Sequence, residues 1–267
     1  MADLNFVRYL NKKYSKESKL SALFSLKELT QIFQDNISEL EKKGFDEIAL
    51  SGLGENFVTY FEKGAAASVC LLFVDVCSFS TRFANYTGEE ISSYFDTYYQ
   101  KVVPIIYKHG GEIDKIIGDG LIVVFGQPFL DKRPVELLKC ADACAKDIIK
   151  ATAGGDFSSK VAFHFGRVNY FKNKSGFYNE YTMIGKPLTE LFRLESITPN
   201  ESISFLENSA VSSHIDRTHL GYTSYGTALR GYYTGDDGQR WYLQSQPLTD
   251  LKGVSEYTCL GTIRMRS

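Results

Sequence analysis

Two stretches of the sequence decide the fold and point to its chemistry: LFVDVCSFS at residues 72–80 and GGEIDKIIGDG at residues 110–120. Each is an apolar, strand-like run that carries an aspartate near its end, Asp75 in the first and Asp119 in the second. An unpaired carboxylate is unfavourable inside a hydrophobic core, so an aspartate at the end of a buried strand usually points into a functional site. Two such carboxylates can hold a pair of divalent metal ions, the usual apparatus for reactions at a nucleotide phosphate.

Bulk composition narrows the class of protein. The chain has 267 residues, 43% of them hydrophobic, which is enough to bury a sizeable core in one large domain with or without an extension. Its net charge of −2 argues against a general nucleic-acid binder, which usually carries an excess of basic side chains. No apolar run approaches the length of a membrane span and the first residues do not form a signal peptide. We therefore expect a soluble, cytoplasmic protein without membrane or nucleic-acid partners.

The cysteine and histidine patterns give no sign of a disulfide framework or a zinc site. The five cysteines are scattered, and Cys140 and Cys144, one helical turn apart, lack a second pair. Buried free thiols are therefore expected. The four histidines show no HxH or HExxH spacing, which argues against zinc chemistry.

Two regions of different character divide the chain. Residues 1–62 are rich in Lys, Glu, Leu and Ser, and apolar residues recur at helical spacing between Leu26 and Lys43. This region is predicted to be a helical extension. Residues 63–267 are predicted to form the compact domain, which opens with the near-continuous apolar run of residues 68–76. A run of this kind is typical of a strand that is covered on both faces.

A long helix is predicted after the first strand. Thr87-Gly88-Glu89-Glu90 fits a capping box, in which the threonine and the last glutamate satisfy each other's backbone N–H groups. Apolar side chains recur on one side of the helix that this box opens. Pro104 sits inside the pattern and should kink the helix, and Gly110-Gly111 should end it.

A hairpin follows, with the second aspartate at its tip. Residues 112–118 and 121–125 read as two strands joined by a tight Asp-Gly turn, which places Asp119 near the end of the Asp75 strand if the strands are neighbours. Alternating strands and helices around a central sheet imply an α/β or α+β domain. The remaining expected elements are a helix from Pro134, strands at 161–165 and 177–183, a short helix at 188–194, and strand-like pieces at 202–205 and 240–243.

Four motifs then follow one another in the order and spacing of a known family. Phe73-Val74-Asp75-Val76 is similar to a strand that carries a first metal aspartate. Lys115-Ile116-Ile117-Gly118-Asp119 matches a Lys-x-x-Gly-Asp motif, with a base-contacting lysine and a second metal aspartate. Glu180-Tyr181-Thr182-Met183-Ile184-Gly185 matches a strand with a second base-contacting residue, and Arg193-Leu194-Glu195-Ser196 matches a closing Arg-Leu-Glu motif.

These motifs, with an "LKG" segment at residues 248–254, make the chain from about Ser68 onward resemble the class III nucleotidyl cyclases. The resemblance implies an α+β, ferredoxin-like domain with a central, mostly antiparallel sheet flanked by helices. It also implies a reaction, the metal-dependent cyclisation of a nucleoside triphosphate to a 3′,5′-cyclic nucleotide second messenger with release of pyrophosphate. Two Mg²⁺ or Mn²⁺ ions held by Asp75 and Asp119 would assist the attack of the ribose 3′-hydroxyl on the α-phosphorus.

The resemblance further implies roles for single residues. Lys115 and Thr182 contact the base, and Arg193 meets the charge that develops on the α-phosphate in the transition state. The start of the helix after Asp75 offers backbone N–H groups to phosphate. The residues that would offer them are Cys77, Ser78 and Phe79.

A homodimer with shared active sites is also implied, because members of the family form head-to-tail dimers with the site at the interface. One protomer supplies Asp75 and Asp119, and the other supplies Lys115, Thr182 and Arg193. This chain has one copy of each motif, so a homodimer would have two equivalent sites.

Three positions depart from the family pattern. Thr189 stands where the family usually has the asparagine that holds the ribose, four residues before the arginine, and its hydroxyl reaches less far than an amide. Ser78 replaces a glycine three residues after the first aspartate, and Gly185-Lys186-Pro187 replaces Gly-Asp-x. These changes put an ordinary adenylate cyclase in question, but not metal-dependent cyclisation.

The identity of the base stays open. The pair of Lys115 and Thr182 resembles an adenylate-specific branch, so ATP is the default substrate. Adenine and cytosine both present a ring-nitrogen acceptor beside an amino donor, so this pair can satisfy either, and guanine and uracil are not excluded. Stand-alone bacterial cyclases that make cyclic CMP or cyclic UMP in anti-phage defence belong to the same family, and the chain is similar to them in lacking a recognisable receptor, kinase or membrane module.

Simpler interpretations exist for each residue. Asp75 could be a helix N-cap, Asp119 the polar residue of a turn, Lys115 a solvated edge lysine, and Arg193 the partner of Glu190 or Glu195 in a surface ion pair. Two other classes of protein also remain. One is a diguanylate cyclase or polymerase palm, which Gly110-Gly111-Glu112 superficially suggests. The other is a nucleotide sensor that has lost turnover, which Thr189 favours.

Overall fold

A computed structural model describes residues 60–61, 63–172, 181–218, 229–234, 238–248, 251, 254 and 256–265. The helix expected between Leu26 and Lys43 lies outside these residues, and the domain boundary after residue 62 stays a prediction. The described strands are β1 (Ala66–Val76), β2 (Glu112–Ile117), β3 (Gly120–Phe125), β4 (Ser159–Lys172), β5 (Tyr181–Ile184), β6 (Ser202–Leu206), β7 (Leu229–Thr234), β8 (Arg240–Pro247) and β9 (Cys259–Met265). The described helices are α6 (Phe79–Arg82), α7 (Gly88–Lys108), α8 (Pro134–Thr152), α9 (Lys186–Ile197) and α10 (Ala210–Thr218).

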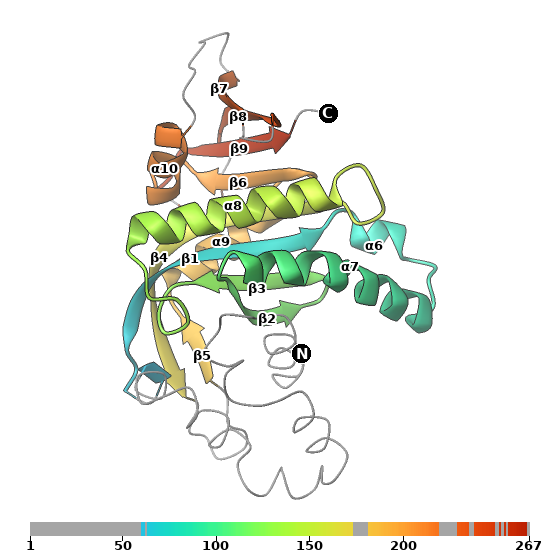
Figure 1. The fold of residues 1–267 in the computed structure, drawn as a ribbon, viewed down its shortest axis with the longest axis horizontal. Coiled ribbons are helices and arrows are strands. Elements are labelled where there is room, and N and C mark those ends of the chain that lie inside the picture. The colour runs from blue at the N-terminus through green and yellow to red at the C-terminus, as the bar shows by residue number, and fades with distance from the viewer. Residues whose placement is uncertain are drawn as a thin grey trace, which may run out of the picture.

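These strands form one sheet in the order β2-β3-β1-β4-β6-β9-β8-β7, with β5 paired to β4 (Figure 1). Among the described strands, β4 and β6 are the one parallel pair, and all other pairs are antiparallel. The α+β fold with a mostly antiparallel sheet flanked by helices is therefore confirmed.

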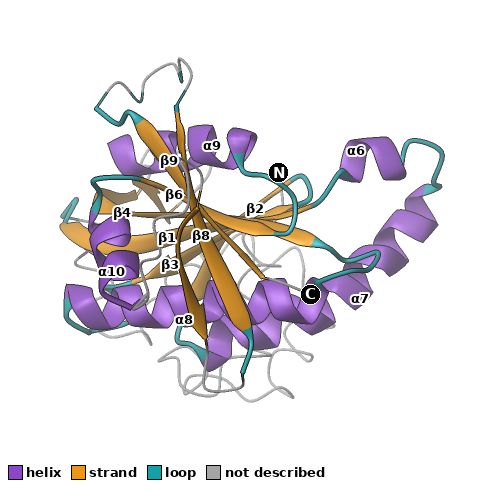
Figure 2. Ribbon diagram, turned by 90° about the horizontal axis from the view of Figure 1, so that it is seen from above, coloured by secondary structure: helices purple, strands orange, loops and turns teal. Residues whose placement is uncertain are grey.

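Helices cover both faces of the sheet, which Figure 2 shows from above: α7 and α8 on one side and α9 on the other. The larger core cluster lies under α7, α8 and α10, and the smaller one lies under α9. Strand β1 contributes to both, because successive side chains of a strand point to opposite faces. Leu72 and Val74 belong to the larger cluster, whereas Leu71 and Phe73 belong to the smaller one. This explains why its sequence is a near-continuous apolar run.

Local sequence signals account for most of the elements. The capping box is present at the start of α7, where the Glu90 N–H donates to the Thr87 hydroxyl at 3.3 Å and the Thr87 N–H donates to the Glu90 carboxylate at 2.8 Å. The helix continues through Pro104 to Lys108. The hairpin of β2 and β3 is confirmed, but its two-residue turn is Gly118-Asp119 and not the predicted Asp119-Gly120, because Gly120 already pairs with Ile117.

Several elements differ from expectation in length. The predicted strand at 161–165 is part of the much longer β4, and the predicted short helix at 188–194 extends to the full length of α9. Of the strand predicted at 177–183, residues 177–180 lie outside the described part, and residues 181–183 belong to β5. Helix α10 and strand β9 were not anticipated. The pattern at α10 is short, and a strand such as β9 is defined by its partners β6 and β8 rather than by its own sequence.

Candidate active site

Asp75 and Asp119 come together at one end of the central strands. Asp75 is the last residue but one of β1, and Asp119 lies in the turn before β3. Because β3 pairs antiparallel with β1, with Val74 opposite Leu121, this turn lies beside the end of β1. Burial raises the pKa of both carboxyl groups, and the negative charge of Asp119 raises that of Asp75 further. Two aspartates from distant segments thus share one partly buried environment.

A lysine that the sequence analysis did not identify completes this charged cluster. Lys160 Nζ lies 3.3 Å from Asp75 Oδ2 and 2.7 Å from Oε1 of Glu195, which belongs to α9. The negative charge of Glu195 also acts on Asp119 and contributes to its raised pKa. No sequence pattern distinguishes Lys160, since a lysine at the start of an apolar strand is common on protein surfaces.

The donor set of this cluster fits a divalent metal ion. Three carboxylates face one ammonium group, so the ionised cluster carries an excess of negative charge in a half-buried setting. Among the described residues, no three or more His, Cys, Asp or Glu side chains form a ready-made ligand cage. Magnesium is usually held by one or two carboxylates together with waters and substrate phosphates, so Asp75 and Asp119 are a sufficient protein contribution.

The turn after Asp75 has an unusual backbone conformation. Ser78 has a φ of 57° and a ψ of 31°, in the left-handed region that glycine adopts without strain, and it precedes the short helix α6. This conformation explains why the related family has glycine there. The Asn200 side chain donates to the Ser78 hydroxyl at 3.2 Å. The Cys77 N–H already donates to the Ser158 carbonyl at 2.8 Å, so of the three expected phosphate-binding residues Cys77 is engaged elsewhere.

Lys115 and Thr182 contact each other although they lie on different hairpins. Lys115 Nζ donates to Thr182 Oγ1 at 2.5 Å, and Thr182 is buried. A β-bulge between Ile113 and Lys115 makes this contact possible. Because of the bulge, Ile113 and Ile116 both belong to the larger core cluster. Lys115 instead lies opposite Ile122, which belongs to the smaller cluster under α9, so the Lys115 side chain is kept out of the larger core. Lys115 is therefore not a solvated edge lysine.

Thr189 and Arg193 are exposed and lie one turn apart on α9. The alternative of a surface ion pair for Arg193 is not observed. Glu190 Oε2 lies 2.9 Å from Nε2 of the buried His164, and Glu195 is held by Lys160. No described carboxylate pairs with Arg193. Within the described part of one protomer, these two residues also make no hydrogen bond or ion pair with Asp75 or Asp119.

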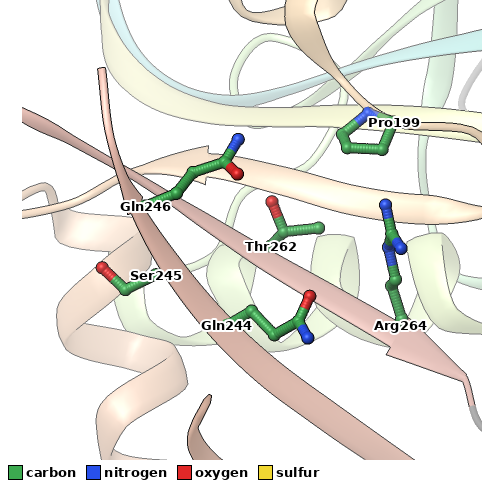
Figure 3. Close-up of a pocket in the computed structure, with 6 residues that line it drawn as sticks. All are labelled: Pro199, Gln244, Ser245, Gln246, Thr262 and Arg264. Atoms are coloured by element: carbon green, nitrogen blue, oxygen red, sulfur yellow. The ribbon is translucent and has the colours of Figure 1, made fainter. Parts of the chain in front are cut away.

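A small cavity elsewhere in the fold is not a nucleotide site. It measures about 100 Å³ and lies at strands β8 and β9 (Figure 3). Pockets for small molecules usually measure about 300–1,000 Å³. None of the expected site residues lines this cavity. Its lining consists of Pro199, Gln244, Ser245, Gln246, Thr262 and Arg264.

Gly110-Gly111 lies between α7 and β2, not in a hairpin turn. This position argues against the diguanylate cyclase interpretation, since that signature sits on a hairpin turn. In the described residues, no helix is both long and apolar enough to span a membrane.

Solved structures with a similar fold are catalytic domains of nucleotidyl cyclases. The guanylate cyclase domain of RhGC from Catenaria anguillulae in complex with GTP aligns with a TM-score of 0.57 and 16% identity, over 76% of this chain and 100% of that chain. The adenylyl cyclase CyaB from P. aeruginosa aligns with a TM-score of 0.55 and 17% identity, over 76% of this chain and 96% of that chain. The resemblance to class III nucleotidyl cyclases is thus confirmed at the level of the fold.

Curated proteins with a similar sequence are distant relatives. An uncharacterized protein of Mycobacterium tuberculosis is 25% identical over 179 residues, which are 64% of this chain and 31% of that protein. The terminal-differentiation-specific adenylate cyclase of Dictyostelium discoideum is 27% identical over 121 residues, 45% of this chain and 5% of that protein. The chain therefore spans a third or less of these curated relatives. No protein-family model matches the chain.

Proposed function

We propose that the chain is a nucleotidyl cyclase, a phosphorus–oxygen lyase that converts a nucleoside triphosphate to a 3′,5′-cyclic nucleotide and pyrophosphate. The observation that carries this proposal is the convergence of Asp75 and Asp119 at the end of β1, on a fold otherwise seen in cyclase catalytic domains. In the reaction the ribose 3′-oxygen forms a bond to the α-phosphorus. The bond from that phosphorus to the bridging oxygen breaks, and pyrophosphate leaves while the hydroxyl proton passes to solvent.

The chain's own residues divide this work. Asp75 and Asp119 would hold two Mg²⁺ or Mn²⁺ ions, which when bound lower the pKa of the 3′-hydroxyl and offset the charge of the leaving phosphates. The Lys115–Thr182 pair would bind the edge of the base, because an ammonium group donates and a hydroxyl both donates and accepts. Thr189 would orient the ribose.

Arg193 would stabilise the charge that develops on the α-phosphate. A guanidinium group suits this role because its donors form a rigid, planar fork. Arg193→Ala is expected to lower kcat by about 10²–10³-fold. The N–H groups of Ser78 and Phe79 would support the phosphates, since that of Cys77 is already used.

A homodimer with shared sites is part of the proposal, and the exposure of Thr189 and Arg193 on α9 supports it. Thr189 and Arg193 face solvent and make no described contact with the aspartates of their own chain, which suits residues that act in the site of a partner subunit. A mixture of Asp75→Ala and Arg193→Ala chains should then regain up to about one quarter of wild-type activity, because half of the dimers are mixed and each has one intact site. Mixed chains as inactive as each variant alone would refute the shared site.

ATP is the proposed substrate, and a pyrimidine triphosphate is the alternative, in which the product would be cyclic CMP or cyclic UMP in anti-phage signalling. The close contact between Lys115 and Thr182 presents a donor beside a hydroxyl, which suits adenine and cytosine alike. The test is incubation with each triphosphate and Mn²⁺, followed by mass spectrometry of the products. Cyclic AMP as the main product supports the proposal, and cyclic CMP or cyclic UMP as the main product supports the alternative.

A nucleotide sensor without turnover is a candidate of another class, and Thr189 in place of asparagine favours it. Tight nucleotide binding without release of pyrophosphate would identify it. The cytoplasmic location stays a prediction.

A further inference from the structure

Lys160 occupies a position that the register of the sheet defines. It lies directly opposite Asp75 in the antiparallel pairing of β1 and β4. Both side chains point to the α9 face of the sheet, as do Phe73 on β1 and Ala162 on β4. An oppositely charged pair across neighbouring strands is a favourable arrangement, and among the described residues Lys160 is the cation that pairs with Asp75.

The same ammonium group also holds α9. Lys160 is closer to Glu195 than to Asp75, at 2.7 Å against 3.3 Å. All three side chains are largely buried, with 17% exposure for Lys160, 14% for Asp75 and 18% for Glu195. Solvent therefore screens these pairs less than it would at the surface. Glu195 is two residues from Arg193, on the helix that also carries Thr189.

We propose that Lys160 is a positioning residue that couples metal binding at Asp75 to the anchoring of α9. The inference rests on the proposed function for the identity of the metal site and for the role of α9. A divalent ion at Asp75 competes with the Lys160 ammonium for the same carboxylate and repels it toward Glu195. Tightening of the Lys160–Glu195 pair then holds the helix that carries Thr189 and Arg193.

Coupling of this kind is reciprocal, so removal of the Lys160 charge and removal of the Glu195 charge should change the metal affinity in opposite directions. Without the Lys160 charge, Asp75 has no competing cation and should bind a metal ion more tightly. Without the Glu195 charge, Lys160 is free to pair with Asp75 alone, and metal binding should weaken. A lysine that only fills space beside Asp75 would not produce these opposite shifts.

The test measures Mn²⁺ binding to the full chain without nucleotide, by isothermal titration calorimetry and electron paramagnetic resonance. Lys160→Met should bind Mn²⁺ about tenfold more tightly, because a unit charge within a few ångströms changes a carboxylate's affinity for a cation by about that factor. Glu195→Gln should bind Mn²⁺ about threefold to tenfold more weakly. Lys160→Arg, which keeps the charge, should stay within about twofold of the wild type.

Lys186→Met is the matched control. Lys186, the first residue of α9, also bridges two carboxylates, those of Glu190 at 3.4 Å and Glu256 at 2.7 Å, but it does not contact Asp75. Its removal should leave Mn²⁺ affinity unchanged. If Lys160→Met does not fold, as judged by circular dichroism, the contrast between Glu195→Gln and Lys160→Arg decides the matter.

Activity provides a second readout. At saturating Mn²⁺, Lys160→Met should show a kcat about tenfold lower despite its tighter metal binding, because α9 has lost its anchor. Mn²⁺ affinity in Lys160→Met equal to or weaker than wild type, or Glu195→Gln no weaker than wild type, would overturn the inference. If the wild type forms no cyclic nucleotide but the Mn²⁺ affinities follow the predicted order, the proposed function fails and the coupling stands.

Discussion

Replacing Asp119 by Asn should make the metal-free protein more stable and at the same time inactive. Asp119 and Asp75 are two partly buried carboxylates that raise each other's free energy when ionised, and only one lysine offsets them. After discounting for solvent and for Lys160, the removal of one charge should raise the free energy of unfolding by about 1 kcal/mol. Asparagine has nearly the same shape as aspartate and is likewise favoured in turns, so the Gly118-Asp119 turn should stay intact.

The assay is thermal unfolding followed by circular dichroism, in EDTA and in Mn²⁺. For a domain of this size, about 1 kcal/mol corresponds to a rise in Tm of about 2–4 °C in EDTA. Mn²⁺ should raise the Tm of the wild type but hardly that of Asp119→Asn, because ligand binding stabilises only the state that binds. A variant that melts below the wild type in EDTA, or that gains as much from Mn²⁺, would refute the reasoning.

The matched control is Asp147→Asn, for which the sign reverses. Asp147 Oδ2 lies 3.0 Å from Lys108 Nζ and 2.9 Å from His109 Nε2. Burial alone would raise the pKa of Asp147, but these partners outweigh burial and lower it. Its removal should therefore destabilise the protein, by about 0.5–1 kcal/mol because the group is partly exposed.

Three further outcomes are expected. Ser78→Gly should fold normally, whereas Ser78→Val should lower the free energy of unfolding by about 1–2 kcal/mol in urea titrations, because a β-branched residue is strained at a φ of 57°; equal stability of the two variants would contradict this. Thr182→Val should lower kcat/KM by about tenfold or more for the preferred base and narrow the preference among bases in competition assays, since Lys115 loses its partner; an unchanged preference would remove Thr182 from base recognition. Burial alone would raise the pKa of Asp142, but Lys146 and His214 outweigh burial and lower this pKa. The ionised Asp142 therefore stabilises the fold above the unfolded-state pKa of about 3.9, and this stabilisation is lost as the pH falls through the lower pKa of the folded state. Asp142→Asn should cost about 3–5 kcal/mol at neutral pH and show a flatter acid-unfolding profile by circular dichroism, because it removes the buried carboxylate that pairs with Lys146.

Much of the fold could be predicted from short stretches of sequence. The capping box at Thr87, the hairpin that carries Asp119 and the buried strand that carries Asp75 all appear in the structure where the sequence indicated. Each depends on neighbours within a few residues, through helix capping, turn preference and the alternation of side chains along a strand. The candidate site residues on these elements were predictable for the same reason.

Other parts of the site depend on contacts between distant segments. The bulge that directs Lys115 toward Thr182 arises where β2 is fitted against β3, and the sequence around Asp114 does not reveal it. Likewise, the resemblance placed a family glycine at the position of Ser78, but only the structure shows its left-handed backbone and its contact with Asn200.

The sequence by itself indicated that two aspartates would lie at the ends of apolar strands and that a nucleotide-cyclase fold would carry them. Only the tertiary structure decided which cation lies beside them. Lys160 faces Asp75 because of the register between β1 and β4, and it reaches Glu195 because α9 packs on that face of the sheet. Register and packing result from burying whole faces of strands and helices at once, so no local pattern specifies them.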